Sequence, residues 1–168
     1  METIPSKNAV LDRATIGRKI KRMALEVAEQ NIEENELVIA GIEGNGMVVA
    51  KAIIRELGNI SSLSSTLVTI RLNKKDPLTV SLDPAIDIEG KAVLVVDDVA
   101  DSGRTLLYAL KPFLAAHPKK IQTLVLVERS HKLFPVQTDY TGLSIATTLQ
   151  EHITVETEGE EIRGAYLY

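Results

Sequence analysis

A short apolar run that ends in two adjacent acids is the feature of this chain that most restricts its fold. Residues Ala92 to Val96 are all aliphatic, which predicts a strand buried on both faces of a parallel sheet. Asp97 and Asp98 follow at once, and the loop from Val99 to Thr105 leads into leucines at helical spacing. Ligands of parallel α/β sheets bind at the carboxyl ends of the strands. We therefore expect a binding site at this strand end.

The loop after the acids is suited to an anion. It carries hydroxyls at Ser102 and Thr105 and a glycine at Gly103, and the helix that follows would direct backbone N–H groups at a bound phosphate. The carboxylates of Asp97 and Asp98 suit ribose hydroxyls or a chelated cation instead. The pattern indicates a site for a phosphorylated sugar with its cation. The alternative is an ordinary strand-to-helix turn in which the two acids are incidental.

The order of apolar strand, acid pair and Asp-Ser-Gly-x-Thr loop resembles the phosphoribosyl-pyrophosphate (PRPP) motif of type I phosphoribosyltransferases. The resemblance implies transfer of ribose 5-phosphate from PRPP to a nucleobase, with release of pyrophosphate and with Mg²⁺ bound through the substrate. Asp97 and Asp98 would hold the ribose hydroxyls and could approach the Mg²⁺. Asp98 and Asp101 would be catalytic, Asp101 as a general base near the nucleobase. The residues expected to cradle the 5′-phosphate are Ala100, Asp101, Ser102, Gly103, Arg104 and Thr105.

Strands and helices alternate along the rest of the chain, which predicts one α/β domain over residues 1–168. We expect the type I phosphoribosyltransferase fold, with a central, mostly parallel sheet flanked by helices and a small C-terminal strand pair. The expected strands are 37–40, 66–70, 92–96 and 121–127, with a pair formed by 153–155 and 165–168. The expected helices begin after Asp12, run from Met47 to Gly58, and run from Leu107 to Ala116.

A second glycine loop, Gly41 to Gly46, follows the first expected strand. Its spacing differs from the dinucleotide-binding fingerprint, and by position it matches the family's pyrophosphate loop. Members of the pyrimidine-operon attenuator type carry Lys and Arg in this loop, where this chain has Glu43 and Asn45. Glu43 would repel a diphosphate if it pointed at the ligand. Alternatively it faces solvent, while Gly44 and Gly46 still offer their N–H groups.

The segment from Leu126 to Gly142 resembles the attenuator and uracil phosphoribosyltransferase (PyrR-type) subfamily. The matching residues are Arg129, His131, Pro135, Asp139, Tyr140 and Gly142. The resemblance implies that Arg129, Tyr140 and Thr141 line the nucleobase pocket, where Tyr140 would stack on the base. The alternative for Tyr140 is a core aromatic with a satisfied hydroxyl. Uracil is the favoured base, and related functions are an RNA-binding transcriptional attenuator or a nucleotide sensor without turnover.

Two residues disagree about the base. Asp101 is the residue type that 6-oxopurine transferases place at this position. Those enzymes also read the 6-oxo group with a lysine on the following strand, where this chain has Glu128. A carboxylate is the wrong partner for a carbonyl oxygen. A 6-oxopurine phosphoribosyltransferase therefore remains an alternative to the uracil enzyme.

The polar stretch from Arg71 to Ser81 shows little periodicity, and we expect a mobile lid there. Lys74 or Lys75 would contact pyrophosphate when the lid closes. Alternatively, the two lysines belong to a solvated loop.

Composition excludes several other classes of protein. The chain has no cysteine, so it cannot form a disulfide framework or use a thiol nucleophile, and we expect a reducing, cytoplasmic compartment. No apolar run approaches the roughly 20 residues of a membrane span. The net charge of −4 argues against bulk nucleic-acid binding. A basic cluster on the first helix nevertheless offers either an RNA-facing patch or a solvated face: Arg13, Arg18, Lys19, Lys21 and Arg22. The family resemblance implies a homo-oligomer.

Overall fold

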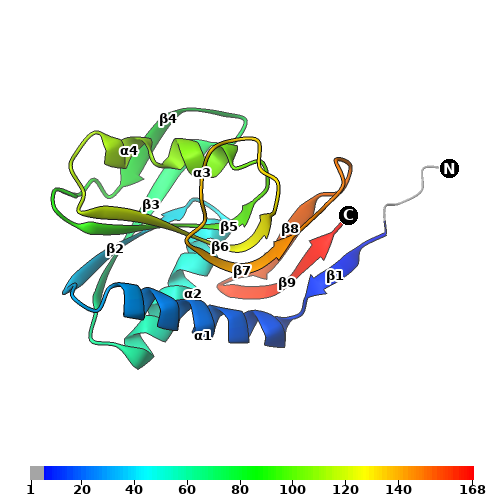
Figure 1. The fold of residues 1–168 in the computed structure, drawn as a ribbon, viewed down its shortest axis with the longest axis horizontal. Helices are drawn as coiled ribbons and strands as arrows, with labels where there is room; N and C mark the ends of the chain where they lie inside the picture. The colour runs from blue at the N-terminus through cyan, green and yellow to red at the C-terminus, as the bar shows by residue number, and fades with distance from the viewer. Residues whose placement is uncertain (1–5) are drawn as a thin grey trace.

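A computed structural model describes residues 6–168, which fold around a six-stranded sheet (Figure 1). The strand order is β4-β3-β2-β5-β6-β7, and neighbouring strands are parallel apart from the antiparallel pair β3 and β4. The bounds are β2 (Glu36–Ile42), β3 (Ser64–Asn73), β4 (Asp76–Asp83), β5 (Ala92–Ala100), β6 (Lys120–Arg129) and β7 (Tyr140–Ile145). Strand β5 is one of the two central strands and is buried over residues 92–96, as the sequence predicts.

Helices cover both faces of the sheet (Figure 1). The long helices α1 (Arg13–Gln30) and α2 (Asn45–Ile60) pack on one face, and the short helices α3 (Arg104–Ala109) and α4 (Lys111–Leu114) lie on the other. Asp12 caps α1 by accepting a hydrogen bond from the N–H of Thr15. The predicted apolar stripe of α1 is buried: Ile16, Ile20, Met23, Ala24 and Val27. In residues 6–168 no helix combines the length and apolar character that crossing a membrane requires.

A second, three-stranded antiparallel sheet lies beside the first. Its order is β1-β9-β8, formed by β1 (Asn8–Leu11), β8 (Ile153–Glu158) and β9 (Glu161–Leu167). The predicted C-terminal strand pair is thus confirmed, and an unpredicted N-terminal strand joins it. β8 contacts β5, so the small sheet closes one side of the region where the central strands end.

Three sequence predictions are wrong in their local structure. The stretch from Arg71 to Ser81 forms the end of β3, a turn and β4, because Leu72, Val80 and Leu82 pack against the core. The helix expected to end at Gly58 continues to Ile60. The helix expected over residues 107–116 is instead two short helices, since Pro112 cannot continue the first one.

Candidate active site

A cleft of about 260 Å³ lies at the carboxyl end of β5. It is bounded by the loop that leads into α3, by the first turn of α2, by the β3–β4 turn and by β8. The lining residues are Asn45, Lys74, the run from Asp97 to Leu106, and Ile153, Thr154 and Val155. The structure thus brings the predicted acid pair and the whole predicted 5′-phosphate loop into one cavity.

The acid pair is held rigidly at the strand end. Asp97 is 1% exposed and Asp98 is 8% exposed. Each carboxylate accepts a hydrogen bond from the next backbone N–H: Asp98 N to Asp97 Oδ1, and Val99 N to Asp98 Oδ1, both 2.9 Å. Burial, reinforced by the charge of Asp98, raises the pKa of Asp97 well above its ordinary value, and the Lys74 ammonium 3.9 Å away opposes this shift.

The raised pKa of Asp97 predicts a pH dependence of stability. Because the folded chain retains a proton that the unfolded chain releases, the free energy of unfolding should fall as the pH rises from the ordinary carboxyl range through the raised pKa. Asp97→Asn keeps an oxygen that can accept from the Asp98 N–H and removes the titration. Denaturant unfolding of the ligand-free protein, measured from about pH 4 upward, should give a flatter profile for the variant than for the wild type. If the free energy of unfolding depends on pH equally in the variant and the wild type, Asp97 is not the group responsible.

The predicted 5′-phosphate loop, Ala100 to Thr105, turns at Gly103, which has a left-handed backbone (φ 85°). A side chain there would also collide with its surroundings, because a Cβ would lie 2.8 Å from Val136 Cγ1. The Ser102 hydroxyl accepts from the N–H of Arg104 at 3.3 Å, and this bond orients the turn into α3. The sequence therefore builds the compact loop that the motif predicts.

In the glycine loop before α2, Glu43 points away from the cleft. Its Oε1 lies 2.6 Å from a guanidinium nitrogen of Arg71, which also pairs with Asp83 at 2.7 Å. These two acids raise the pKa of Arg71, and the hydrogen bonds that Arg71 donates to Asp83 are the larger cause. The carboxylate of Glu43 is therefore neutralised by Arg71 rather than directed at the ligand.

Asn45 connects three parts of the site. Its amide nitrogen donates to Asp98 Oδ2 at 3.2 Å and to the carbonyl of Val155 at 2.9 Å, while its oxygen accepts from Thr157 at 2.9 Å. At the next position, a Cβ on Gly46 would lie 3.1 Å from Asp97 Oδ1, so α2 can approach the acid pair closely. The glycine loop thus supports the acids through an amide and a close backbone approach.

The residues predicted for the nucleobase pocket separate into two groups. Arg129 does not line the cleft itself but contacts Asp101, which does: its Nε lies 2.6 Å from Asp101 Oδ1, and its guanidinium donates to the carbonyl of Glu151 at 2.7 Å. Tyr140 lies in the core, 3% exposed, and its hydroxyl donates to Gln122 at 2.7 Å. Burial raises the pKa of Tyr140 to about 12, and the geometry contradicts the predicted base stacking. Thr141 also lies outside the cleft and contacts Thr138.

Comparison with known proteins identifies the family. Residues 6–159 match the family model described as "Phosphoribosyl transferase domain". The chain belongs to the phosphoribosyltransferase family. The "Bifunctional protein PyrR" of Bacillus cereus is 33% identical over 164 residues, covering 90% of this chain and 91% of that protein. The protein of the same name from Haemophilus ducreyi is 29% identical over 159 residues, with 89% of each chain covered.

Solved phosphoribosyltransferase structures share the fold. The hypoxanthine phosphoribosyltransferase of Trypanosoma cruzi superposes with a TM-score of 0.78, covering 94% of this chain and 95% of that one, at 20% identity. A hypoxanthine-guanine phosphoribosyltransferase from Bacillus anthracis is 25% identical, with a TM-score of 0.65 and 82% of each chain covered. These likenesses confirm the fold and leave the base open.

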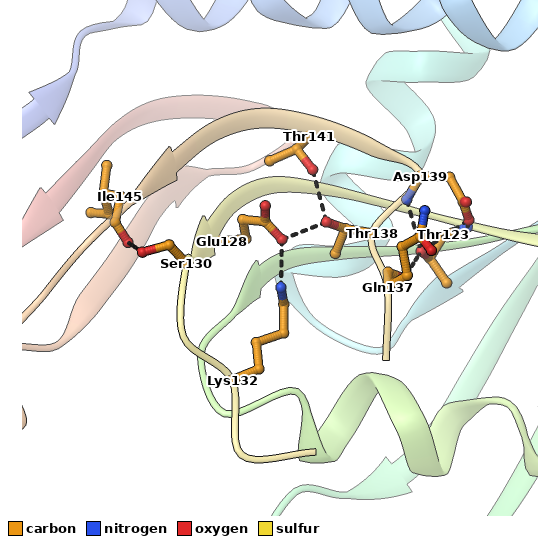
Figure 2. A network of polar contacts seen from close by, with 9 residues as sticks. All are labelled: Thr123, Glu128, Ser130, Lys132, Gln137, Thr138, Asp139, Thr141 and Ile145. Carbon is orange, nitrogen blue, oxygen red and sulfur yellow. Dashed lines mark hydrogen bonds and ion pairs between the residues drawn. The ribbon is translucent and has the colours of Figure 1, made fainter. Parts of the chain in front are cut away.

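In this phosphoribosyltransferase, hydrogen bonds from nearby side chains hold the carboxylate of Glu128, the residue that stands where 6-oxopurine enzymes have a lysine. Its carboxylate accepts from Lys132 at 2.7 Å and from the hydroxyl of Thr138 (Figure 2). Burial raises the pKa of Glu128, but the bonds from Lys132 and Thr138 outweigh it, so the pKa lies below its ordinary value. Glu128 therefore faces its own network rather than a base.

The fold also places the lysines predicted for the lid and the cations predicted on α1. Lys74 lines the cleft, whereas Lys75 is on the turn outside it, where its N–H is bonded to Asn73. On α1, Arg13 pairs with Glu161 at 3.0 Å and Arg22 with Glu26 at 2.6 Å. Two of the five cations of that helix are therefore paired with acids.

The contribution of β8 was missed from the sequence. Ile153, Thr154 and Val155 line the cleft, yet nothing in their local pattern distinguishes them from any other short strand. Within residues 6–168, groups of three or more metal-binding side chains are absent. A cation in this site would therefore take ligands from a bound substrate and from water as well as from the acid pair.

Proposed function

We propose that this phosphoribosyltransferase transfers the ribose 5-phosphate of PRPP to a nucleobase, with uracil the favoured base. The observation that carries the proposal is the placement of Asp97 and Asp98 against the loop from Ala100 to Thr105 in one cleft. One sugar phosphate in this cleft could therefore contact the acid pair with its ribose and the loop with its phosphate. Similarity to the PyrR proteins favours uracil over a purine.

The residue roles follow from this placement. Asp97 and Asp98 would hold the ribose hydroxyls, and their oxygens are ligands that suit Mg²⁺. Mg²⁺ bound with PRPP would supply charge neutralisation at the pyrophosphate leaving group. The backbone of the glycine loop and Lys74 would face the diphosphate. The acid pair fits this group because residues 6–168 add no third side-chain ligand to the two buried carboxylates, which leaves coordination positions for substrate oxygens.

Asp101 would accept or orient the proton of the attacking base nitrogen. It lines the cleft, and the guanidinium of Arg129 holds its carboxylate in place. As C1′ loses pyrophosphate it develops positive charge, which nearby carboxylates stabilise electrostatically. The protein therefore needs no covalent intermediate, and its work is to position the two substrates and to stabilise charge.

Nucleotide formation with a panel of bases tests the proposal. The protein is incubated with PRPP and Mg²⁺ and offered uracil, hypoxanthine, guanine, xanthine, adenine or orotate in parallel. Turnover of uracil above the other bases is the expected result, and preferred turnover of hypoxanthine or guanine would establish a 6-oxopurine enzyme instead. Nucleotide binding without turnover of any base would contradict the enzyme and favour an RNA-binding regulator or a nucleotide sensor.

A further inference from the structure

The loop that joins β6 to β7 packs directly on the 5′-phosphate loop. We name residues Ser130 to Gln137 the clamp loop. The N–H groups of Leu133 and Phe134 both donate to the carbonyl of Ser102, at 2.9 and 3.1 Å. The side chain of Lys132 passes over Gly103, with its Cδ 3.3 Å from where a Cβ would lie. The conformation of the phosphate loop is therefore coupled to that of the clamp loop.

A largely buried ion pair links the clamp loop to the sheet (Figure 2). Lys132 donates to Glu128, at the end of β6, and the two side chains are only 14% and 15% exposed. The hydroxyl of Thr138 donates to the same carboxylate and lies 2.8 Å from the hydroxyl of Thr141. Removing one charge from such a pair leaves the other poorly compensated, so we expect the pair to fix the loop strongly.

The far end of the clamp loop is held on β6 by hydrogen bonds that join side chains to the backbone and one that joins two backbone groups. The hydroxyl of Thr123 on β6 donates to the carbonyl of Gln137, and the N–H of Asp139 donates to the carbonyl of Thr123 at 3.0 Å (Figure 2). The N–H of Thr123 in turn donates to Asp139 Oδ2 at 2.8 Å. The other end is fixed to β7, because the N–H of Ser130 donates to the carbonyl of Ile145 at 2.9 Å. Between these two fixed ends, the Glu128–Lys132 pair holds the part of the loop that contacts Ser102 and Gly103.

We propose that Glu128 and Lys132 are positioning residues for PRPP binding, which act on the 5′-phosphate loop through the clamp loop. Both lie outside the cleft lining, so they would act through the bonds from Leu133 and Phe134 to Ser102 and through the packing on Gly103. The inference deepens the proposed function, because it assumes that the loop from Ala100 to Thr105 holds the 5′-phosphate.

Lys132→Met tests the proposal most directly, because methionine keeps an unbranched stem over Gly103 and removes the ammonium. We expect the Kd and the KM for PRPP to rise about tenfold, with a smaller change in kcat, since a displaced loop binds the phosphate less well. In the ligand-free protein, hydrogen exchange at Leu133 and Phe134 should be faster, with the effect confined to the two loops. Lys132→Arg retains the charge and should restore most of the affinity.

Two further variants separate this effect from general damage. Lys91→Met removes a lysine that pairs with Glu36 before β5, at the opposite end of the sheet, and should leave PRPP affinity unchanged. Thr138→Val removes one hydrogen-bond donor to Glu128 and should weaken PRPP binding, but less than Lys132→Met does. It tests the proposal if Lys132→Met does not fold.

The outcomes distinguish this inference from the proposed function. Folded Lys132→Met with wild-type PRPP affinity and wild-type exchange at Leu133 and Phe134 would overturn the positioning role. If the wild-type protein binds no PRPP, the proposed function fails. The exchange measurement then still decides whether the ion pair sets the conformation of the phosphate loop, and unchanged exchange would overturn that as well.

Discussion

Asp98→Asn is expected to lower nucleotide formation at least about 100-fold, which corresponds to about 2.7 kcal/mol on the activation barrier. Asp98 lies at the end of β5, 8% exposed, with one oxygen bonded to the N–H of Val99. Its other oxygen faces the amide of Asn45 in the cleft. Asparagine fits the same volume but loses the charge that would attract the substrate-bound Mg²⁺ and hold the ribose hydroxyls. Initial rates at saturating PRPP measure the effect.

Asp87→Asn is the matched control. Asp87 is exposed in the segment before β5, and its side chain accepts from the N–H of Glu89, a bond that asparagine can also make. Its turnover should stay at the wild-type level. Circular dichroism should show both variants folded. Turnover of Asp98→Asn within about threefold of wild type would remove the acid pair from the catalytic account.

Gly142→Ala should cause the largest loss of stability among single substitutions of glycine, about 2–3 kcal/mol. Gly142 lies on β7 next to β6, and a Cβ there would lie 2.3 Å from the carbonyl oxygen of Leu126. That oxygen belongs to the backbone of a central strand and cannot move aside without shifting the whole strand. Urea unfolding followed by far-ultraviolet circular dichroism measures the change.

Gly17→Ala, measured by the same urea unfolding, should instead raise the free energy of unfolding. Gly17 lies within α1 with open space around the Cβ position, so alanine should stabilise the chain by about 0.5–1 kcal/mol through its higher helix propensity. Equal stabilities for Gly142→Ala and the wild-type protein would show that β6 and β7 are not packed as closely as the structure has them.

The sequence predicted the elements whose signals are local. Strand β5 and its loop were recognisable because the apolar run, the acids and the small residues adjoin one another in the chain. The hairpin of β3 and β4 was missed because its apolar residues alternate among lysines and a proline, and pairing with a neighbouring strand decided its conformation. Strand β1 depends wholly on pairing with β9, at the other end of the chain.

The site shows the same division. The acids and the loop after them belong to one motif, and all of them line the cleft. Tyr140 was misplaced because a pattern cannot tell which face of β7 a side chain occupies. Likewise, the neutralisation of Glu43 by Arg71 joins residues on separate elements. Such contacts between separate elements determine whether a charged side chain is neutralised, and they cannot be read from the spacing of residues in the sequence.

The central claim is that Asp97, Asp98 and the loop from Ala100 to Thr105 form a single PRPP site. Isothermal titration calorimetry of the wild-type protein with PRPP and Mg²⁺ tests it most directly, with Asp98→Asn and Asp87→Asn titrated in parallel. We expect one PRPP bound per chain, binding that is greatly weakened by Asp98→Asn and unchanged by Asp87→Asn. Absence of PRPP binding to the folded wild-type protein, or full binding by Asp98→Asn, would contradict the account.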